Sequence, residues 1–472
     1  MTTESPRMSL PTLTALVVGS MIGAGVFTLP ARFGGSAGAL AAIVAWVIAG
    51  AGMLTLALVF QHLAMRKPDL NSGVFAYAKA GFGDYVGFNS AFGYWASACA
   101  GNAFFWVFMM STIGEVWPSL GQGDTIVAAS LSTVGIWVFA GLIARGVKDA
   151  AVINRIVTVA KMIPILAFIM IAAFTFDPGT FTGNFWGADT FSMSAVAEQV
   201  KDTMVITVFV FMGIEGASVY SRYARRREDV GWATILGLVS VLCVFASVTL
   251  LSYGVLPRKE IADLRQPSMA PLLDEIVGEW GSAFISVGVV VAVLGAYLAW
   301  TLMAAEVLFV PAQNDDMPRF MRRENGAGAP IAALLMTTAM VQALIVVVLF
   351  SRDALDFLLD LCASLSLIPY FLAAAFALKL AVDRKPGAAL EKKPLIVAVL
   401  ATIYTVFLVY AAGPEFLLLS CIFYAPGTLL YVRSRRESGD RVFRPLELVL
   451  CVLIVVGAVL GVVGLATGSI TM

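Results

Sequence analysis

The chain has 472 residues, of which 60% are hydrophobic and 13% are charged, whereas soluble domains are typically about half apolar and one quarter charged. Its 31 basic and 31 acidic residues balance, so no global charge points to nucleic acid or to an acidic partner. The five cysteines lie far apart within apolar stretches and His62 is the one histidine, so neither a disulfide framework nor a metal cluster is indicated and no cofactor is expected. Water is therefore not the main solvent, and one membrane-embedded body is expected in place of several soluble domains.

Thirteen apolar segments follow one another along the chain. They begin near Leu10, Leu40, Tyr85, Thr125, Val152, Lys201, Trp232, Gly281, Ile331, Ala354, Pro394, Glu415 and Leu446. Most are about 20 residues or longer, which is the length that a helix needs to cross the hydrocarbon core. The first is too long, and too soon followed by another, to be a cleaved signal peptide. The sequence therefore predicts an all-α polytopic membrane protein with about 13 spans.

The basic residues predict the orientation of these spans. A cytoplasmic N-terminus places 24 of the 31 basic residues inside and six outside, while Lys161 lies within a span. The positive-inside rule favours this orientation. The expected location is the inner membrane of the cell. An odd number of spans then places the C-terminus outside. The longest external loop, about Pro257 to Trp280, has room for short amphipathic helices.

Two spans carry glycine clusters at their midpoints, Gly19 to Gly25 in the first and Phe211 to Gly216 in the sixth. The clusters occupy corresponding places in two five-helix sets of opposite orientation, which indicates an inverted repeat with discontinuous helices 1 and 6. The predicted divisions are 1–180 for the first repeat, 181–383 for the second and 384–472 for additional C-terminal helices.

An unwound stretch in a span exposes backbone N–H groups at the start of one half-helix and carbonyl groups at the end of the other. The N–H groups suit a carboxylate and the carbonyls suit an ammonium group or a cation. An amino acid supplies both groups, so we expect its site between the two breaks. The alternative is that the glycines only allow close helix packing.

Three ionisable residues lie deep in spans, where each costs about 2.5–3.5 kcal/mol on insertion scales. Glu215 is in the second break, where a carboxylate could be protonated, contact a cationic substrate or couple the two half-helices. Lys161 could be a fixed positive charge that satisfies carbonyls of the first helix, and Glu306 is either its partner or reaches toward the cytoplasmic side. Structural pairing is the alternative for each.

Six short runs carry a resemblance to a known family. They are Gly19 to Phe27, Phe211 to Ser218, Ala299 to Leu302, Arg66 to Leu70, Tyr77 to Tyr85 and Leu367 to Tyr370. The first three resemble the basic amino acid/polyamine antiporters of the amino acid-polyamine-organocation superfamily, and the last three look like its arginine/ornithine antiporter group. The resemblance covers nearly the whole chain and implies the ten-helix inverted repeat (5+5) of the sodium-coupled leucine transporter type, with extra C-terminal helices and alternating access around a midplane site.

The resemblance implies roles for individual residues in binding the substrate. Gly23, Ala24 and Gly25 would bind the carboxylate, and carbonyls from Phe209 to Gly213 would bind the ammonium group. Asn102 matches a position that contacts the guanidinium side in arginine exchangers. Ala24 departs from several relatives that carry serine there, so the backbone alone must bind the carboxylate.

The resemblance also implies gate and coupling residues. Phe209, Trp300, Tyr94 and Tyr370 match aromatic gate positions, and an aromatic face can hold a cation. Phe209 stands where the arginine/agmatine exchangers have tryptophan. Glu215 matches the gate carboxylate, and Lys161 resembles a lysine that fills the sodium site in some proton-linked relatives, which implies sodium independence.

These observations predict a secondary transporter in which arginine enters as ornithine leaves, and like-charged exchange of this kind needs no ion gradient. The transport alternatives are a proton-coupled amino acid importer with Glu215 as the titrating group, or an exchanger of lysine, histidine or a diamine. A channel would need a continuous pore with rings of filter residues. An enzyme is not expected, because no HExxH motif or nucleophile elbow lies in a span. The expected partners are cationic amino acids and the lipid bilayer, and a homodimer is left open.

Overall fold

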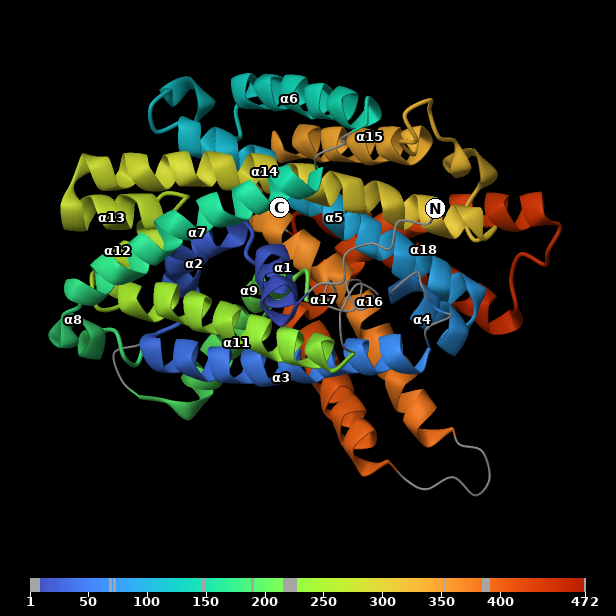
Figure 1. Cartoon of the computed structure of the whole chain (residues 1–472), viewed down its shortest axis with the longest axis horizontal. Helices are drawn as coiled ribbons and strands as arrows, with labels where there is room; N and C mark the ends of the chain where they lie inside the picture. Colours follow the sequence, from blue (N-terminus) through green and yellow to red (C-terminus); the bar gives the residue numbers. More distant parts are fainter. Residues whose placement is uncertain are drawn as a thin grey trace. The chain divides into compact units, whose positions relative to one another are not determined.

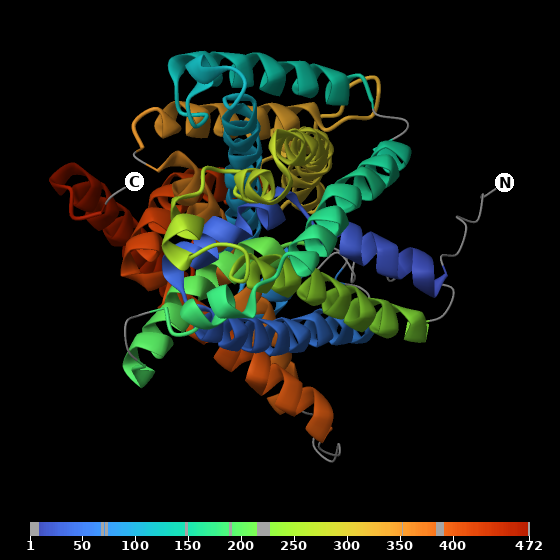
Figure 2. The same cartoon turned by 90° about the vertical axis from the view of Figure 1, so that its left-hand side faces the viewer.

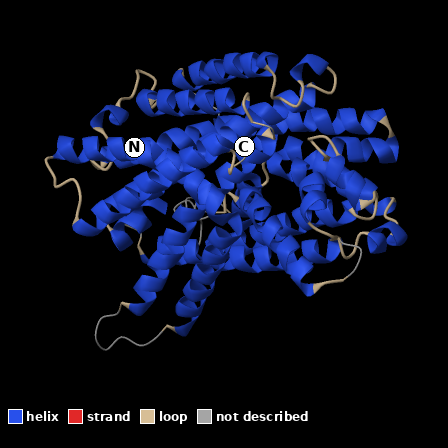
Figure 3. Cartoon of the chain, turned by 180° about the vertical axis from the view of Figure 1, so that it is seen from behind, coloured by secondary structure: helices blue, strands red, loops and turns tan. Residues whose placement is uncertain are grey.

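The computed structural model describes residues 9–67, 70, 74–146, 150–187, 191–214, 227–351, 353–383 and 391–470. Helices dominate these residues and no strand occurs among them (Figure 3). Within this described part, ten helices are long and apolar enough to cross a membrane, and an eleventh span results if the bent pair Leu10–Met21 and Ala24–Ser36 counts as one. The predicted all-α polytopic membrane protein is confirmed at this level.

The chain forms two compact units, and each unit draws on both halves of the sequence. Unit 1 consists of Met1–Gly73, Thr158–Val289 and Ala373–Ala411. Unit 2 consists of Val74–Val157, Val290–Leu372 and Ala412–Met472. These are spatial groupings, whereas the predicted divisions at 180 and 383 are sequence repeats and stay a prediction.

The helices that lie wholly within unit 1 are α1 (Leu10–Met21), η1 (Ala24–Thr28), α2 (Leu29–Ser36), α3 (Ala39–Arg66), α8 (Pro178–Gly183), α9 (Met193–Phe211), α11 (Arg227–Ser252), α12 (Arg258–Asp263) and α13 (Met269–Val277). The short helices α12 and α13 occupy the loop that was expected to hold such elements.

The helices that lie wholly within unit 2 are α4 (Val74–Phe82), α5 (Asp84–Ile113), η2 (Pro118–Leu120), α6 (Ile126–Ala144), η4 (Arg319–Arg322), α15 (Ile331–Val348) and α18 (Pro445–Thr467). Four long helices begin in one unit and end in the other: α7 (Ala150–Phe174), α14 (Glu279–Gln313), α16 (Ala354–Val382) and α17 (Lys392–Ser438).

The first span is broken in its middle, as its glycine cluster predicts. α1 ends at Met21, and Ile22 and Gly23 adopt extended backbone conformations before η1 begins at Ala24. The axis turns by 52° across this break. The predicted discontinuity of the first helix is therefore confirmed.

The sixth span ends at the second glycine cluster. α9 stops at Phe211, and Gly213 has a φ of +101°, a conformation that favours glycine because it carries no Cβ. Residues 215–226 lie outside the described residues, so Glu215 and the continuation of this span are not placed.

In unit 1, α3 packs against α9 and α11, and α1 packs against α11 (Figure 1). Trp46 of α3 stacks on Phe33 of α2, with the ring centroids 5.0 Å apart, and contacts the edge of Phe211 at 6.0 Å. Aromatic pairs in these geometries add about 0.5–1.5 kcal/mol beyond the burial of their area. The broken first span and α9 therefore share one aromatic core.

In unit 2, α5 is the buried central helix and is flanked by α4, α6 and α15. The helices α6 and α15 lie side by side (Figure 2). Nearly every residue of α5 is buried, which fits its apolar character on all faces.

Candidate functional site in the broken helices

The two glycine breaks meet inside unit 1. The hydroxyl of Ser20, at the end of α1, donates a hydrogen bond of 3.1 Å to the carbonyl oxygen of Gly213. A Cβ atom on Gly213 would lie only 2.5 Å from the carbonyl oxygen of Ser20, so the two backbones approach as closely as glycine allows. The structure thus brings together the two features that the sequence singled out.

η1 begins next to open space at Gly23. The first N–H groups of a helix have no partner within the helix, and they lie at the positive end of its dipole. A Cβ atom on Gly23 would meet nothing within 4 Å. Ala24 and Gly25 are buried directly after it. This arrangement can bind an anion, and a carboxylate is the anion that an amino acid carries.

Phe209 of α9 lies against the same stretch of chain. A Cβ atom on Gly25 would lie 2.6 Å from Cε1 of the Phe209 ring and 3.2 Å from Cγ1 of Val210. Only glycine therefore allows this ring to rest on the backbone of η1, and Phe209 itself stays half-buried. An apolar ring thus packs on the backbone of Gly25, two residues after the open space at Gly23.

Lys161 of α7 lies at the carbonyl end of α1. Its side chain is 4% exposed, and Nζ donates a hydrogen bond of 2.8 Å to the carbonyl oxygen of Gly19. A cation is stabilised at the C-terminus of a helix by the helix dipole and by the unsatisfied carbonyls there. Lys161 therefore provides a fixed donor at the first break.

Unit 2 holds another group of predicted residues, carried by α5 and α14. The side-chain amide of Asn102 donates a hydrogen bond of 3.2 Å to Oγ1 of Thr301, the residue that follows Trp300. Asn102 is fully buried, and within the described residues its Oδ1 atom has no hydrogen-bond partner. A buried acceptor without a partner costs about 1–3 kcal/mol, and an N–H group of a ligand would remove this cost.

The other predicted residues of unit 2 differ in burial. Tyr94 of α5 is buried and its hydroxyl contacts the sulfur of Met303 at 3.8 Å. Tyr370 of α16 is fully buried and Trp300 is half-buried. Glu306 of α14 is exposed.

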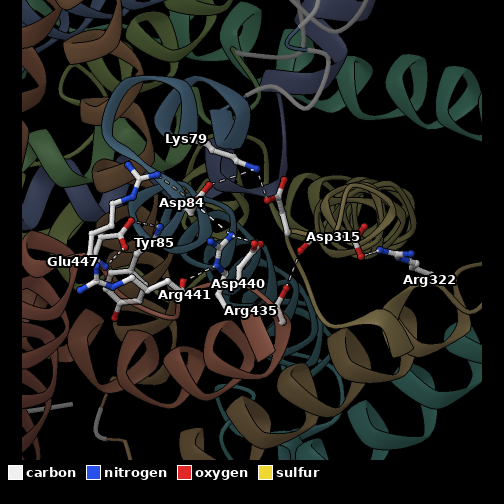
Figure 4. A network of polar contacts seen from close by, with 12 residues as sticks. Lys79, Asp84, Tyr85, Asp315, Arg322, Arg435, Asp440, Arg441 and Glu447 are labelled. Carbon is white, nitrogen blue, oxygen red and sulfur yellow. Dashed lines mark hydrogen bonds and ion pairs between the residues drawn. The ribbon is translucent and has the colours of Figure 1, made fainter. Parts of the chain in front are cut away.

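A network of charged groups in unit 2 was not predicted (Figure 4). Asp84, the first residue of α5, has three cations within 4 Å: Lys79 at 3.7 Å, Arg435 at 3.6 Å and Arg444 at 3.8 Å. Lys79 also pairs with Asp316, and burial raises the pKa of the Asp316 carboxyl despite this pair. From the sequence, these cations were used to orient the spans, and Lys79 also lies in the run Tyr77 to Tyr85 that carries the family resemblance.

Glu447 of α18 joins the same network. One of its carboxylate oxygens accepts the backbone N–H of Tyr85 at 3.3 Å and the other accepts that of Arg444 at 2.8 Å, and the side chain is 7% exposed. One carboxylate therefore satisfies a donor at the start of α5 and another at the start of α18. A local signal existed, because a glutamate three positions after the residue that precedes a helix is typical of a capping box.

Comparison with known proteins agrees with these features. The profile of the amino acid permease family matches residues 8–427. The chain is 44% identical to an arginine/ornithine antiporter of Pseudomonas aeruginosa, with 99% of each chain covered. It is 40% identical to an L-lysine transport protein of Corynebacterium glutamicum, covering 99% of this chain and 97% of that protein. It is also 36% identical to an arginine/agmatine antiporter of Chlamydia abortus, covering 91% and 90%. The broken first helix, the membrane-spanning composition and this similarity over the whole length together establish that the chain belongs to the amino acid permease family.

Proposed function

We propose that this protein exchanges cationic amino acids across the membrane, with arginine entering as ornithine leaves. The observation that carries the proposal is the meeting of the two glycine clusters in unit 1, where η1 begins beside the open space at Gly23 and its first N–H groups have no partner within the helix. The relatives named arginine/ornithine antiporters support this pair of substrates.

The backbone of unit 1 binds the two charged groups that all α-amino acids share. The N–H groups of Gly23, Ala24 and Gly25 bind the carboxylate, because they are the unpaired donors at the positive end of η1. Carbonyls at the end of α9, from Phe209 to Gly213, bind the ammonium group. Backbone recognition of this kind leaves the choice of side chain to other residues.

The cationic side chain of the substrate is recognised by polar and aromatic groups. In unit 2, the buried Oδ1 atom of Asn102 would accept an N–H of a guanidinium group, and the family resemblance assigns the aromatic faces for such a group to Trp300 and Phe209. Tyr94, Tyr370 and Glu215 act as gates, as the family resemblance implies. Glu306 is exposed and has no assigned contact with the substrate.

The exchange is driven by the two substrate gradients and needs no sodium ion. Lys161 supports this, because its ammonium group contacts the carbonyl end of α1, where a cation would otherwise be held. Replacing sodium by choline on both sides of the membrane should leave the exchange rate unchanged.

The helix packing of unit 1 supports an inverted 5+5 repeat. Such a repeat relates the first span to the sixth and the second to the seventh. α1 packs on α11, which is the first span on the seventh, and α3 packs on α9, which is the second span on the sixth. The repeat operation exchanges these two contacts, as expected for related halves.

A total of 13 spans with an external C-terminus completes this proposal. α17 contains a non-helical residue, Gly413, with φ 80° and ψ 168°, and this kink supports a division of its 47 residues into two spans. α9 adds a further span. It is less apolar than most of the other long helices because its first half contains Glu198, Lys201 and Asp202.

An exchange assay in proteoliposomes tests the proposed function. Uptake of labelled arginine should require arginine or ornithine inside the vesicles, because an exchanger changes between its outward-facing and inward-facing states only with a substrate bound. Vesicles without protein are the control for leakage. Equal uptake into protein-containing vesicles that hold buffer alone would disprove the exchange.

A lysine transporter is the second candidate, because an L-lysine transport protein is similar over almost the whole chain. Competition by unlabelled arginine, ornithine, lysine, histidine and putrescine ranks the substrates directly. A proton-coupled importer would instead respond to an imposed pH gradient, and Glu215→Gln would abolish that response.

A further inference from the structure

The outer half of the first span, α2, is held at both ends by one external segment of unit 1, Tyr253 to Ser268. This segment contains α12 and ends where α13 begins. A half-helix of eight residues has few hydrogen bonds of its own, and the groups at its ends need partners from elsewhere. The partners come from about 220–240 positions further along the chain.

Ser268 occupies the junction between η1 and α2. Its hydroxyl accepts the backbone N–H of Ala31 at 3.2 Å and donates to the carbonyl oxygen of Phe27 at 3.2 Å. Ser268 is fully buried. One hydroxyl therefore satisfies an unpaired donor of α2 and bonds an acceptor of η1, so the angle between these two helices depends on it.

The other end of α2 is capped by two further side chains. Arg258 donates to the carbonyl oxygens of Gly34 at 2.8 Å and Gly35 at 3.1 Å. The hydroxyl of Tyr253 donates to the carbonyl oxygen of Ala37 at 2.7 Å. Between the two ends, a Cβ atom on Gly34 would lie 2.8 Å from Cγ2 of Ile261. The segment thus caps the carbonyl end of α2 and packs against its middle.

The same contacts reach the N–H groups at the first break. The hydroxyl of Thr28 donates to the carbonyl oxygen of Gly25 at 2.8 Å, and α13 packs against η1. A shift of Ser268 therefore moves Phe27 and Thr28, and with them the backbone of residues 23–25.

We infer that α2 and the segment Tyr253 to Ser268 move as one rigid body during transport, and that Ser268 is a positioning residue for the carboxylate of the substrate. This inference rests on the proposed function for the identity of the ligand at residues 23–25. The external segment is then part of the moving machinery, because it cannot stay behind without breaking the bonds at both ends of α2.

The kinetic test compares Ser268→Ala with Ser252→Ala. Both serines are almost fully buried in unit 1, but among the residues that the structure describes the hydroxyl of Ser252 bonds only to the carbonyl oxygen of Val248 in its own helix, at 2.7 Å. Ser268→Ala should raise the arginine concentration for half-maximal exchange about fivefold, the effect of one lost hydrogen bond, while the maximal rate changes less. Ser252→Ala should leave the half-maximal concentration within about twofold of the parent. Equal effects of the two variants, or an effect of Ser268→Ala on the maximal rate alone, would overturn the positioning role.

A disulfide between Gly34→Cys and Ile261→Cys tests the rigid body without relying on Ser268. A Cβ atom on Gly34 lies 3.1 Å from Cβ of Ile261, close to the roughly 3.5–4.5 Å of a disulfide. The oxidised pair should form and should exchange arginine at the rate of the reduced pair, with the two single-cysteine variants as controls. Exchange that stops on oxidation and returns on reduction would overturn the inference, as would failure of the pair to cross-link. Cross-linking does not depend on the substrate. If the parent protein does not exchange arginine, the proposed function is refuted, while the cross-linking result still tests the rigid body.

Discussion

Glycine has two different tasks at the meeting breaks. Gly213 has a positive φ and its missing Cβ makes room for the backbone of Ser20, so it is required for folding. Gly23 has an extended conformation that any residue can adopt, and a Cβ there would meet only open space. A side chain at Gly23 would therefore occupy the space beside the N–H groups without disturbing the fold.

Gly23→Ala should weaken substrate binding and leave stability unchanged. The added methyl group competes with the carboxylate, and the loss of one charge-assisted hydrogen bond corresponds to about tenfold in the half-maximal arginine concentration. The thermal unfolding midpoint in detergent should match that of the parent. A lowered midpoint would show that Gly23 is required for folding.

Gly213→Ala is the matched contrast. Alanine at a positive φ costs about 1–2 kcal/mol, and its Cβ would collide with the Ser20 carbonyl oxygen. The unfolding midpoint should fall clearly below that of Gly23→Ala. Equal midpoints for the two variants would contradict the different tasks assigned to these glycines.

Sequence patterns located the breaks because glycine clusters within apolar spans are a local signal. They also singled out Lys161, since a buried lysine needs a partner. Ser268 gave no such signal. Serine is common in loops, and its value depends on Phe27 and Ala31, more than 200 positions away in the chain.

At the level of elements, the carboxylate of Glu447 joins the starts of α5 and α18. Glu447→Ala removes an acceptor from both, and each unsatisfied N–H costs about 1–3 kcal/mol where water cannot replace it. The unfolding midpoint should drop, whereas Glu415→Ala, an exposed acid of α17, should leave it unchanged. Identical midpoints for the two variants would mean that water replaces the carboxylate at both helix starts.

The turn after α14 should give unit 2 a pH dependence. Burial raises the pKa of Asp316, so the folded protein binds a proton there more readily than the unfolded chain. Stability from this group is therefore present at low pH and is lost as the pH rises from about 4 through the raised pKa. In the pH dependence of the unfolding midpoint, Asp316→Asn should remove this decline. Parallel profiles for the parent and the variant would show that Asp316 does not cause the pH dependence.

The sequence predicts helices better than it predicts their contacts. The starts of the long helices and the short elements of the loop between α11 and α14 follow from apolar length and loop composition. The ion pairs of Asp84 with Arg435 and Arg444 do not, because any of the many basic residues at that end of the spans could have reached it.

For the whole molecule, the proposed topology can be tested at its ends. The basic residues put the N-terminus inside and 13 spans put the C-terminus outside. A C-terminal tag should therefore be labelled in intact cells, and an N-terminal tag only after the membrane is permeabilised. Protection of both tags would mean an even number of spans, with α9 or the division of α17 at Gly413 as the first candidates for revision.

Hydropathy alone indicated a membrane protein but could not distinguish a transporter from a channel. The paired glycine clusters and the family resemblance made that distinction. The grouping of residues into two units was not predictable, because it follows from packing between helices that all have similar apolar surfaces.

The bond between Glu447 and Tyr85 also has a consequence for biosynthesis. The two residues are 362 positions apart, so at about 5–20 residues per second the ribosome reaches Glu447 roughly 20–70 seconds after Tyr85. During that time the start of α5 lacks its acceptor, and unit 2 as a whole waits for its last helix. Synthesis that stops before α18 would thus leave a chain whose early helices are inserted in the bilayer without the Glu447 contact. A membrane quality-control protease should degrade this form.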